Sequence, residues 1–194
     1  MNYQAMTAKG EVHLDIAGET DIEEIVTLVN QAYRGKRGHK TWTTENDLVE
    51  GTRTTSEEVR DLVTRSDSQI LLCRLAGPIV ATIHLEKTSE SKAYLGMLAV
   101  SPSMQGDGLG KMMLREAENY IRDIWQCTEV TITVISQRTE LIEFYHRRGY
   151  VPIAGIRPYP GDGKFGRPKL QSLTIESFTK SLVTQPVGKA NCHQ

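Results

Sequence analysis

Long apolar runs, paired cysteines and an excess of one charge are all missing from this sequence. No apolar stretch approaches the roughly 18 residues that span a bilayer, and the first residues lack the basic and then apolar pattern of a secretory signal. The cysteines number 3 and stand apart, at Cys73, Cys127 and Cys192. Their odd number and scattered spacing argue against a disulfide framework and a zinc cluster. We therefore expect a cytoplasmic protein without a metal.

The charges are nearly balanced. Lys and Arg total 23 and Asp and Glu total 24, which leaves a formal net charge of -1. Nucleic-acid-binding domains carry a marked basic excess, so we expect neither a nucleic-acid partner nor a membrane partner. The 194 residues, 39% of them hydrophobic, predict a single globular domain that is large enough to bury its own core.

The hydrophobic pattern predicts an α+β fold around one sheet, because strand-like and helical segments do not alternate strictly. We expect one domain over residues 1–182, with its core at about 12–179, a loose leader at residues 1–10 and a tail at 183–194. A short helical turn is expected near 46–50. The expected strands are 12–16, 69–75, 78–86, 93–100, 129–136, 150–156 and 172–179, and the expected helices are 20–35, 55–65, 109–125 and 140–148.

A glycine-rich turn joins the strand at 93–100 to the following helix. Its sequence, from Gln105 to Lys111, is Gln-Gly-Asp-Gly-Leu-Gly-Lys. Glycines let a ligand approach the backbone closely, and the N–H groups at a helix start favour a phosphate or pyrophosphate. A dinucleotide fingerprint would need glycine at Lys111, and a P-loop would need Ser or Thr at Met112. Neither motif fits, and a plain strand-to-helix turn is the alternative.

The spacing of Gln105, Gly108 and Gly110 fits Q/R-x-x-G-x-G/A, and the segment resembles the acetyl-CoA pyrophosphate loop of the GNAT N-acetyltransferase superfamily. The preceding strand, residues 94–100, resembles the bulged strand of that family that pairs with the pantetheine arm. Residues 141–150 are similar to the family segment F-Y-x-x-x-G-F/Y. The resemblance implies a GNAT fold, with a mixed central sheet of about seven strands and about four flanking helices.

Residue roles follow from the resemblance. The pantetheine arm of acetyl-CoA would lie along Leu98, Ala99 and Val100. The pyrophosphate would be held, mainly by backbone N–H groups, at Gln105, Gly106, Asp107, Gly108, Leu109, Gly110 and Lys111. Tyr145 matches the tyrosine that protonates the departing thiolate. Where many members have an asparagine seven residues before this tyrosine, the sequence has Arg138, which we expect near the phosphates of the cofactor.

The implied reaction is acetyl transfer to a primary amine of a small molecule or peptide, by direct attack in a ternary complex. A protonated amine has no lone pair, so a base or a water chain is required. The candidates are His84 and Glu86, which share one face of a strand. We expect the acceptor pocket to include Tyr33, Trp42, Tyr159 and Phe165.

Three alternatives stay open at this point. An acetyl-cysteine route would use Cys73 or Cys127, although neither has a histidine paired with it by spacing. A catalytically silent GNAT-like module would bind CoA or a partner without turnover. The chain could also act as a monomer or as a homodimer.

Overall fold

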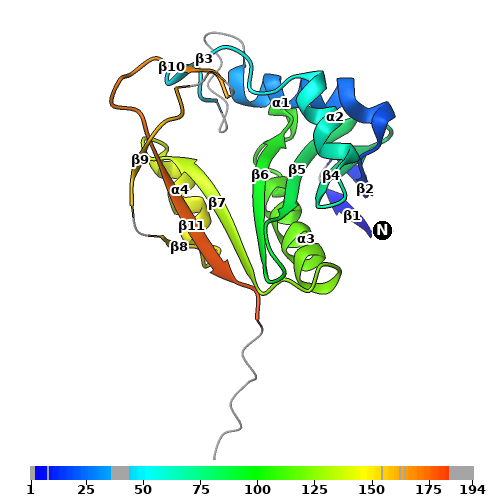
Figure 1. Ribbon diagram of the computed structural model, residues 1–194. Helices are drawn as coiled ribbons and strands as arrows, with labels where there is room; N and C mark the ends of the chain where they lie inside the picture. Colours follow the sequence, from blue (N-terminus) through cyan, green and yellow to red (C-terminus); the bar gives the residue numbers. More distant parts are fainter. Residues whose placement is uncertain are drawn as a thin grey trace, which may run out of the picture.

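The computed structural model describes residues 3–7, 9–35, 44–153, 155–161, 163 and 165–183. Within them a mixed sheet lies between helices, so the predicted α+β class is confirmed (Figure 1). None of the helices in these ranges has the length and hydropathy needed to cross a bilayer. The helices are α1 (Ile22–Arg34), α2 (Ser56–Thr64), α3 (Leu109–Asp123) and α4 (Thr139–His146), with single 3-10 turns at Glu19–Asp21 and Pro102–Met104.

The main sheet runs in the order β1-β2-β4-β5-β6-β7-β11-β8, with β9 also paired to β11. A separate small sheet joins β10 to β3. Among the described residues, each pair of neighbouring strands is antiparallel except β6 and β7, which are parallel. The strands are β1 (Tyr3–Thr7), β2 (Gly10–Ile16), β3 (Val49–Glu50), β4 (Ser68–Leu75), β5 (Ile79–Lys87), β6 (Lys92–Val100), β7 (Glu129–Ile135), β8 (Val151–Pro152), β9 (Arg157–Pro158), β10 (Arg167–Pro168) and β11 (Thr174–Ser181).

The prediction of a loose leader is wrong for residues 3–7. They form β1, which pairs with β2 through a tight turn at Gly10, whose φ is +129°. This strand lies at the edge of the sheet, so it is stabilised by backbone pairing with one neighbour and needs little hydrophobic alternation. The helical turn expected near 46–50 is present but ends earlier, because the N–H groups of Leu48 and Val49 donate to the Glu45 carbonyl at 2.9 and 2.8 Å. Val49–Glu50 then forms β3 and pairs with Pro168 and Arg167.

The strand expected at 150–156 is broken into two short pieces. Val151–Pro152 pairs with the middle of β11, and Arg157–Pro158 pairs with the beginning of β11. Each piece ends at a proline, which has no N–H to continue a ladder. The sheet therefore has more strands than the expected number of about seven, mostly because of such short pairings.

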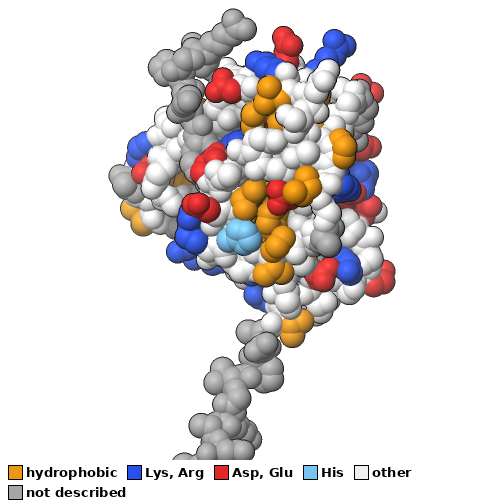
Figure 2. All heavy atoms as spheres, turned by 90° about the vertical axis from the view of Figure 1, so that its left-hand side faces the viewer, with side chains coloured by type: hydrophobic (Ala, Val, Ile, Leu, Met, Phe, Trp, Pro, Cys, Tyr) orange, Lys and Arg blue, Asp and Glu red, His pale blue; other side chains and the backbone are white. Residues whose placement is uncertain are grey.

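The core lies on both faces of the sheet. Along β4, Leu71 and Cys73 pack in the cluster under α3 and α4, whereas Ile70 and Leu72 pack in the cluster under α1 and α2. This alternation places α1 and α2 over one face and α3 and α4 over the other. Figure 2 shows the side of the molecule that carries β8, β9 and β11, where hydrophobic side chains gather between charged ones. In this region Val151, Ile153 and Ile156 are exposed.

Candidate active site

The candidate site begins where β6 and β7 separate. Their parallel ladder joins Lys92–Leu95 to Glu129–Ile132 and goes no further. Figure 1 shows the two strands diverging beyond that point. The second half of β6 therefore has no β7 partner, and its backbone on this side is open to an extended ligand.

A bulge in β6 lies directly at this opening. Thr82 of β5 pairs with Ala99, whereas His84 pairs with Gly96, so Met97 and Leu98 together face one residue of β5. Met97 has a φ of +48°, a strained value for a side chain of this kind. The Met97 carbonyl accepts a hydrogen bond from the Thr82 hydroxyl at 3.3 Å. In a trans peptide the next N–H points the opposite way, so the Leu98 N–H points away from the Thr82 hydroxyl.

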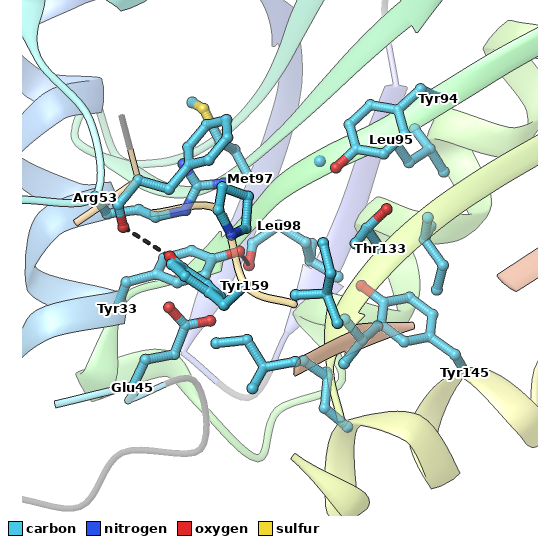
Figure 3. A pocket seen from close by; sticks show the side chains of 18 of the residues that line it. Tyr33, Glu45, Arg53, Tyr94, Leu95, Met97, Leu98, Thr133, Tyr145 and Tyr159 are labelled. Carbon is cyan, nitrogen blue, oxygen red and sulfur yellow. Dashed lines mark hydrogen bonds between the residues drawn. The ribbon is translucent and has the colours of Figure 1, made fainter. Parts of the chain in front are cut away.

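A cavity of about 360 Å³ occupies the opening (Figure 3). The structure brings Tyr33, Leu98, Tyr145, Tyr159 and Phe165 together in its wall. These residues come from α1, β6, α4 and the segment before β11, so four of the predicted acceptor and catalytic tyrosine and phenylalanine side chains share one space. The fifth aromatic expected here, Trp42, lies outside the described residues.

Tyr145 combines a packed ring with a hydroxyl at the cavity. Its side chain is only 7% exposed, and its ring makes edge contacts with Phe144 and Tyr150 at centroid distances of 5.2 and 5.3 Å. Figure 3 shows its hydroxyl directed into the cavity. Burial holds the pKa of Tyr145 well above its usual value of 10.0. The phenol therefore stays protonated at neutral pH and acts as a hydrogen-bond donor toward whatever fills the cavity.

Arg34 holds the end of the cavity that Phe165 and Tyr159 line. Its guanidinium donates to the carbonyl of Gly51, to the Glu45 carboxylate and to the carbonyl of Phe165, each at 2.8 Å. Tyr159 also donates to the Phe165 carbonyl, at 2.9 Å. These bonds join the end of α1 to two loops that are distant in the sequence. They give the loops a fixed position around the cavity.

Tyr33 links this end to the bulge. Its hydroxyl donates to the Leu98 carbonyl at 3.2 Å, and burial raises its pKa to about 12. The bond keeps the Leu98 carbonyl turned toward α1.

Several cavity residues were missed by sequence reasoning. Tyr94 of β6 lines the cavity together with Thr133 of β7. Its ring lies over Gly96, where a Cβ atom would come within 2.9 Å of it. Alternation along β6 places these two residues on one face and was the available signal. Glu45, a buried carboxylate beside Arg34 and Arg138, and Arg53 have no such local signature.

The glycine-rich loop lines a second cavity, of about 320 Å³. Gly108 precedes α3 with a φ of +79°, and no side chain caps this helix start. A Cβ atom on Gly106 or Gly108 would meet nothing within 4 Å. The first turn of α3 also carries no acidic residue. The backbone N–H groups at this end are therefore directed at open space, as an anion site requires.

Two arginines outside the predicted site residues also line this cavity. Arg147 and Arg148 follow α4 and face the loop together with Phe144. Arg148 stacks on the Phe144 ring at 3.4 Å, and its buried Nε atom has no hydrogen-bond partner in the described residues. Burial and the neighbouring Arg147 lower the pKa of Arg148. An anion bound in this cavity would accept a hydrogen bond from the Nε atom and would raise the pKa of Arg148 again.

Arg138 lies elsewhere. It precedes α4, is buried, and bonds to Glu140 at 2.5 Å, with Glu45 at 4.0 Å. Among the described residues it faces the acceptor side rather than the loop cavity.

His84 and Glu86 line a third cavity, of about 500 Å³, which shares Arg53, Tyr94, Met97 and Phe165 with the first. The Nε2 atom of His84 lies 3.0 Å from the Ser68 hydroxyl, and burial lowers the pKa of His84 to about 4. His84 is therefore neutral at pH 7 but is a weak base. Glu86 is bound by Arg65 at 2.7 Å.

The two described cysteines are distant from this chemistry. Both are buried, and Cys73 belongs to the main core cluster, where burial raises its pKa to about 11. A thiol with this pKa carries little thiolate at neutral pH. Neither cysteine lines the cavity at Tyr145. Within the described ranges no three His, Cys, Asp or Glu side chains group as metal ligands would.

Comparison with known proteins agrees with this geometry. Residues 37–150 match the model of the acetyltransferase (GNAT) family, which is more than half of the chain. No curated protein sequence matches.

The fold is similar to that of solved N-acetyltransferases. An N-acetyltransferase from Staphylococcus aureus Mu50 has a TM-score of 0.68 at 15% identity, with 89% of this chain and 99% of that chain covered. The ribosomal-protein-S18-alanine N-acetyltransferase from Escherichia coli has 0.67 at 14% identity, with 91% and 97% covered. A variant of spermidine N-acetyltransferase from Vibrio cholerae has 0.62 at 12% identity, with 87% and 94% covered.

Proposed function

The chain belongs to the acetyltransferase (GNAT) family, and from that premise we propose that it moves the acetyl group of acetyl-CoA directly to a primary amine. The observation that carries this proposal is the cavity at the split between β6 and β7, where the Tyr145 hydroxyl faces the unpaired half of β6. When bound, acetyl-CoA supplies the activated acetyl thioester. The steps below concern what this chain does around it.

The cofactor site fits a pyrophosphate. The start of α3 lacks a side-chain cap, and the glycines leave its N–H groups accessible. Gln105 to Lys111 would hold the pyrophosphate by these groups. Arg148, with its unpartnered Nε atom, would add a charged donor. Leu98, Ala99 and Val100 would pair with the pantetheine arm along the edge that β7 leaves open.

The thioester carbonyl would be polarised by the Leu98 N–H. This group points away from the Thr82 hydroxyl because the Met97 carbonyl of the same peptide is held by Thr82. A backbone donor fixed in this way needs no reorganisation when negative charge develops on oxygen. Its strained position, with φ of +48° at Met97, is held by the hydrogen bonds of Thr82 and Tyr33.

Tyr145 would donate its hydroxyl proton toward the departing sulfur. Because the pKa of Tyr145 is raised and that of a thiol is about 8.5, complete transfer is uphill. The hydroxyl therefore acts first as a hydrogen-bond donor that stabilises the thiolate. Arg138 and Arg148, whose charges favour the phenolate, reduce the cost of a fuller transfer.

The proton of the acceptor amine would leave toward the third cavity. His84 and Glu86 line it, and it shares four residues with the cavity at Tyr145. Since the pKa of His84 is about 4, His84 would orient water rather than keep the proton. Of the two routes expected from the sequence, a base or a water chain, the water chain fits better. It would lead past His84 and Glu86 to solvent.

A small amine suits the acceptor pocket. Tyr33, Tyr159 and Phe165 enclose it, and Arg34 fixes the loops that carry two of them. The solved proteins named for spermidine and for ribosomal-protein alanine both acetylate amines, which supports an amine acceptor of a small molecule or peptide here. Cytoplasmic location and a homodimer stay predictions, which cell fractionation and sedimentation would test.

The experiment is an assay of free thiol with acetyl-CoA and a panel of polyamines, aminoglycosides, amino acids and peptide N-termini. Transfer predicts thiol release that depends on one acceptor class. The competing candidate is a module that binds CoA without turnover. Tight CoA binding by calorimetry with no thiol release across the panel would favour that module.

A further inference from the structure

Arg53 lies where the acceptor cavities meet. It belongs to the segment between β3 and α2, and it lines both the cavity at Tyr145 and the cavity at His84. Figure 3 shows it at the side of the first cavity near Tyr33 and Tyr159. Its side chain is half-buried, so its charge is only partly screened by solvent.

The backbone of this segment is held firmly. The Asn30 side chain accepts from the N–H groups of Arg53 and Thr54, at 2.6 and 3.3 Å, and donates to the Thr54 carbonyl at 2.9 Å. The Arg53 guanidinium lies 5.2 Å from the ring centre of Tyr33 and 4.9 Å from that of Phe165. Aromatic faces thus position the cation from the sides.

Three other arginines near these cavities are matched with carboxylates. Arg34 binds Glu45, Arg65 binds Glu86, and Arg138 binds Glu140. In contrast, within the described part of the chain, the Arg53 side chain has no carboxylate partner and no hydrogen bond; its interactions are the two ring contacts. A guanidinium presents five donors in a planar fork that fits a carboxylate.

We propose that Arg53 binds a carboxylate of the acceptor, so that the acceptor is a small amine that also carries a carboxylate, such as an amino acid. The inference rests on the proposed acetyl transfer and names its substrate class. With the carboxylate on Arg53, the amine of such a molecule extends within the same cavity toward Leu98 and Tyr145. Two charge-assisted hydrogen bonds would fix both its position and its orientation.

A polyamine is disfavoured by the same charges. Three of the acids that line the third cavity are engaged. Glu58 accepts from Thr54 and Thr55 at the start of α2, Glu86 binds Arg65, and Asp61 lies 3.9 Å from Arg65; the fourth, Glu57, is exposed. A second ammonium group of a polyamine would meet the unbalanced Arg53 guanidinium. Like charges in a partly buried cavity repel.

The test compares matched amines by calorimetry on the full chain saturated with CoA. Each pair is an amino acid and its decarboxylated amine: leucine with isoamylamine, phenylalanine with phenethylamine, and lysine with cadaverine; phosphoethanolamine and spermidine are added. We expect the amino acid of at least one pair to bind at least tenfold more tightly than its amine, as a pair of charged hydrogen bonds predicts. The proposal would be overturned if the two members of every pair bound equally or if no amino acid bound. It would also be overturned if phosphoethanolamine or spermidine bound more tightly than the amino acids.

Variants test whether Arg53 is responsible. Arg53→Gln should reduce the preference for the carboxylate to within about twofold while leaving CoA affinity unchanged, and Arg53→Lys should keep part of it. Arg157→Gln is the control, because Arg157 lines the same cavity but donates to Ser177, and the preference should survive. A preference that persists in Arg53→Gln refutes the role of Arg53.

Turnover separates this inference from the proposed function. Preferential binding of an amino acid without thiol release would uphold the role of Arg53 and refute the transferase. Thiol release that is equal for amino acids and their amines would uphold the transferase and refute the role of Arg53.

Discussion

Replacing Tyr145 by phenylalanine removes one oxygen atom from the proposed chemistry and little else. The ring is packed against Phe144 and Tyr150, and the phenylalanine ring keeps these contacts. General acids contribute about 10²- to 10⁴-fold to a rate. Because the raised pKa of Tyr145 makes complete proton transfer uphill, we expect the lower end, a fall in kcat of about 100-fold. This equals about 2.7 kcal/mol of transition-state stabilisation.

The assay is steady-state thiol release at saturating acetyl-CoA, with acetyl-CoA affinity measured by calorimetry. The affinity of Tyr145→Phe should stay within about twofold of the wild type, since we propose that the cofactor phosphates bind at the separate loop cavity. Tyr150→Phe is the matched control, because the Tyr150 hydroxyl binds Glu118 at 3.0 Å and lies outside the cavity wall. It should keep its kcat. Full kcat in Tyr145→Phe would remove this hydroxyl from the mechanism.

Three other changes probe the loop, the clamp and the buried histidine. Gly108 has a φ of +79°, so Gly108→Ala should weaken acetyl-CoA binding about tenfold, through backbone strain and because the new Cβ atom blocks the N–H groups. The control is Gly77→Ala, at a φ of +114° in the β4–β5 turn, which should leave the acetyl-CoA affinity measured by calorimetry unchanged. Arg34→Lys loses the fork that joins the loops and should raise the KM for the acceptor about tenfold with acetyl-CoA affinity constant; an unchanged KM contradicts the clamp. For His84, whose folded pKa of about 4 lies below the usual 6.5, the unfolded chain binds a proton first as pH falls. Stability should decline between about pH 6.5 and 4 by up to about 3 kcal/mol. His84→Gln should flatten this slope in urea unfolding at pH 7 and 4.5, and an equal slope in both proteins would contradict the burial effect.

Local spacing was enough to predict the glycine loop and the α4 tyrosine. The loop depends on neighbours within seven positions, from Gln105 to Lys111, and its helix start is set by the same few residues. Tyr145 likewise belongs to a short segment whose helix and closing glycine are close in sequence. Such features can be predicted without knowledge of tertiary contacts.

The acceptor side depends on contacts that no local pattern encodes. Arg53 is placed by Asn30 and by the rings of Tyr33 and Phe165, and Glu45 is placed by Arg34. Each of these partners is distant in the sequence. Sequence reasoning did predict Tyr33, Tyr159 and Phe165, which line the cavity, but not the charged residues Glu45 and Arg53 that lie among them. The edge strand β1 was missed for a related reason, since backbone pairing rather than a side-chain pattern stabilises it.

The central claim, acetyl transfer at the Tyr145 cavity, is tested most directly by mass spectrometry of acceptor and protein together. Acetyl-CoA is mixed with the protein and the amine panel, and acetylated amine and free CoA are measured in the same sample. The account predicts equal amounts of the two products, a protein that itself carries no acetyl group, and formation of both products that is about 100-fold slower in Tyr145→Phe. Bound acetyl-CoA with no acetylated amine, or an acetylated cysteine on the protein, would contradict it.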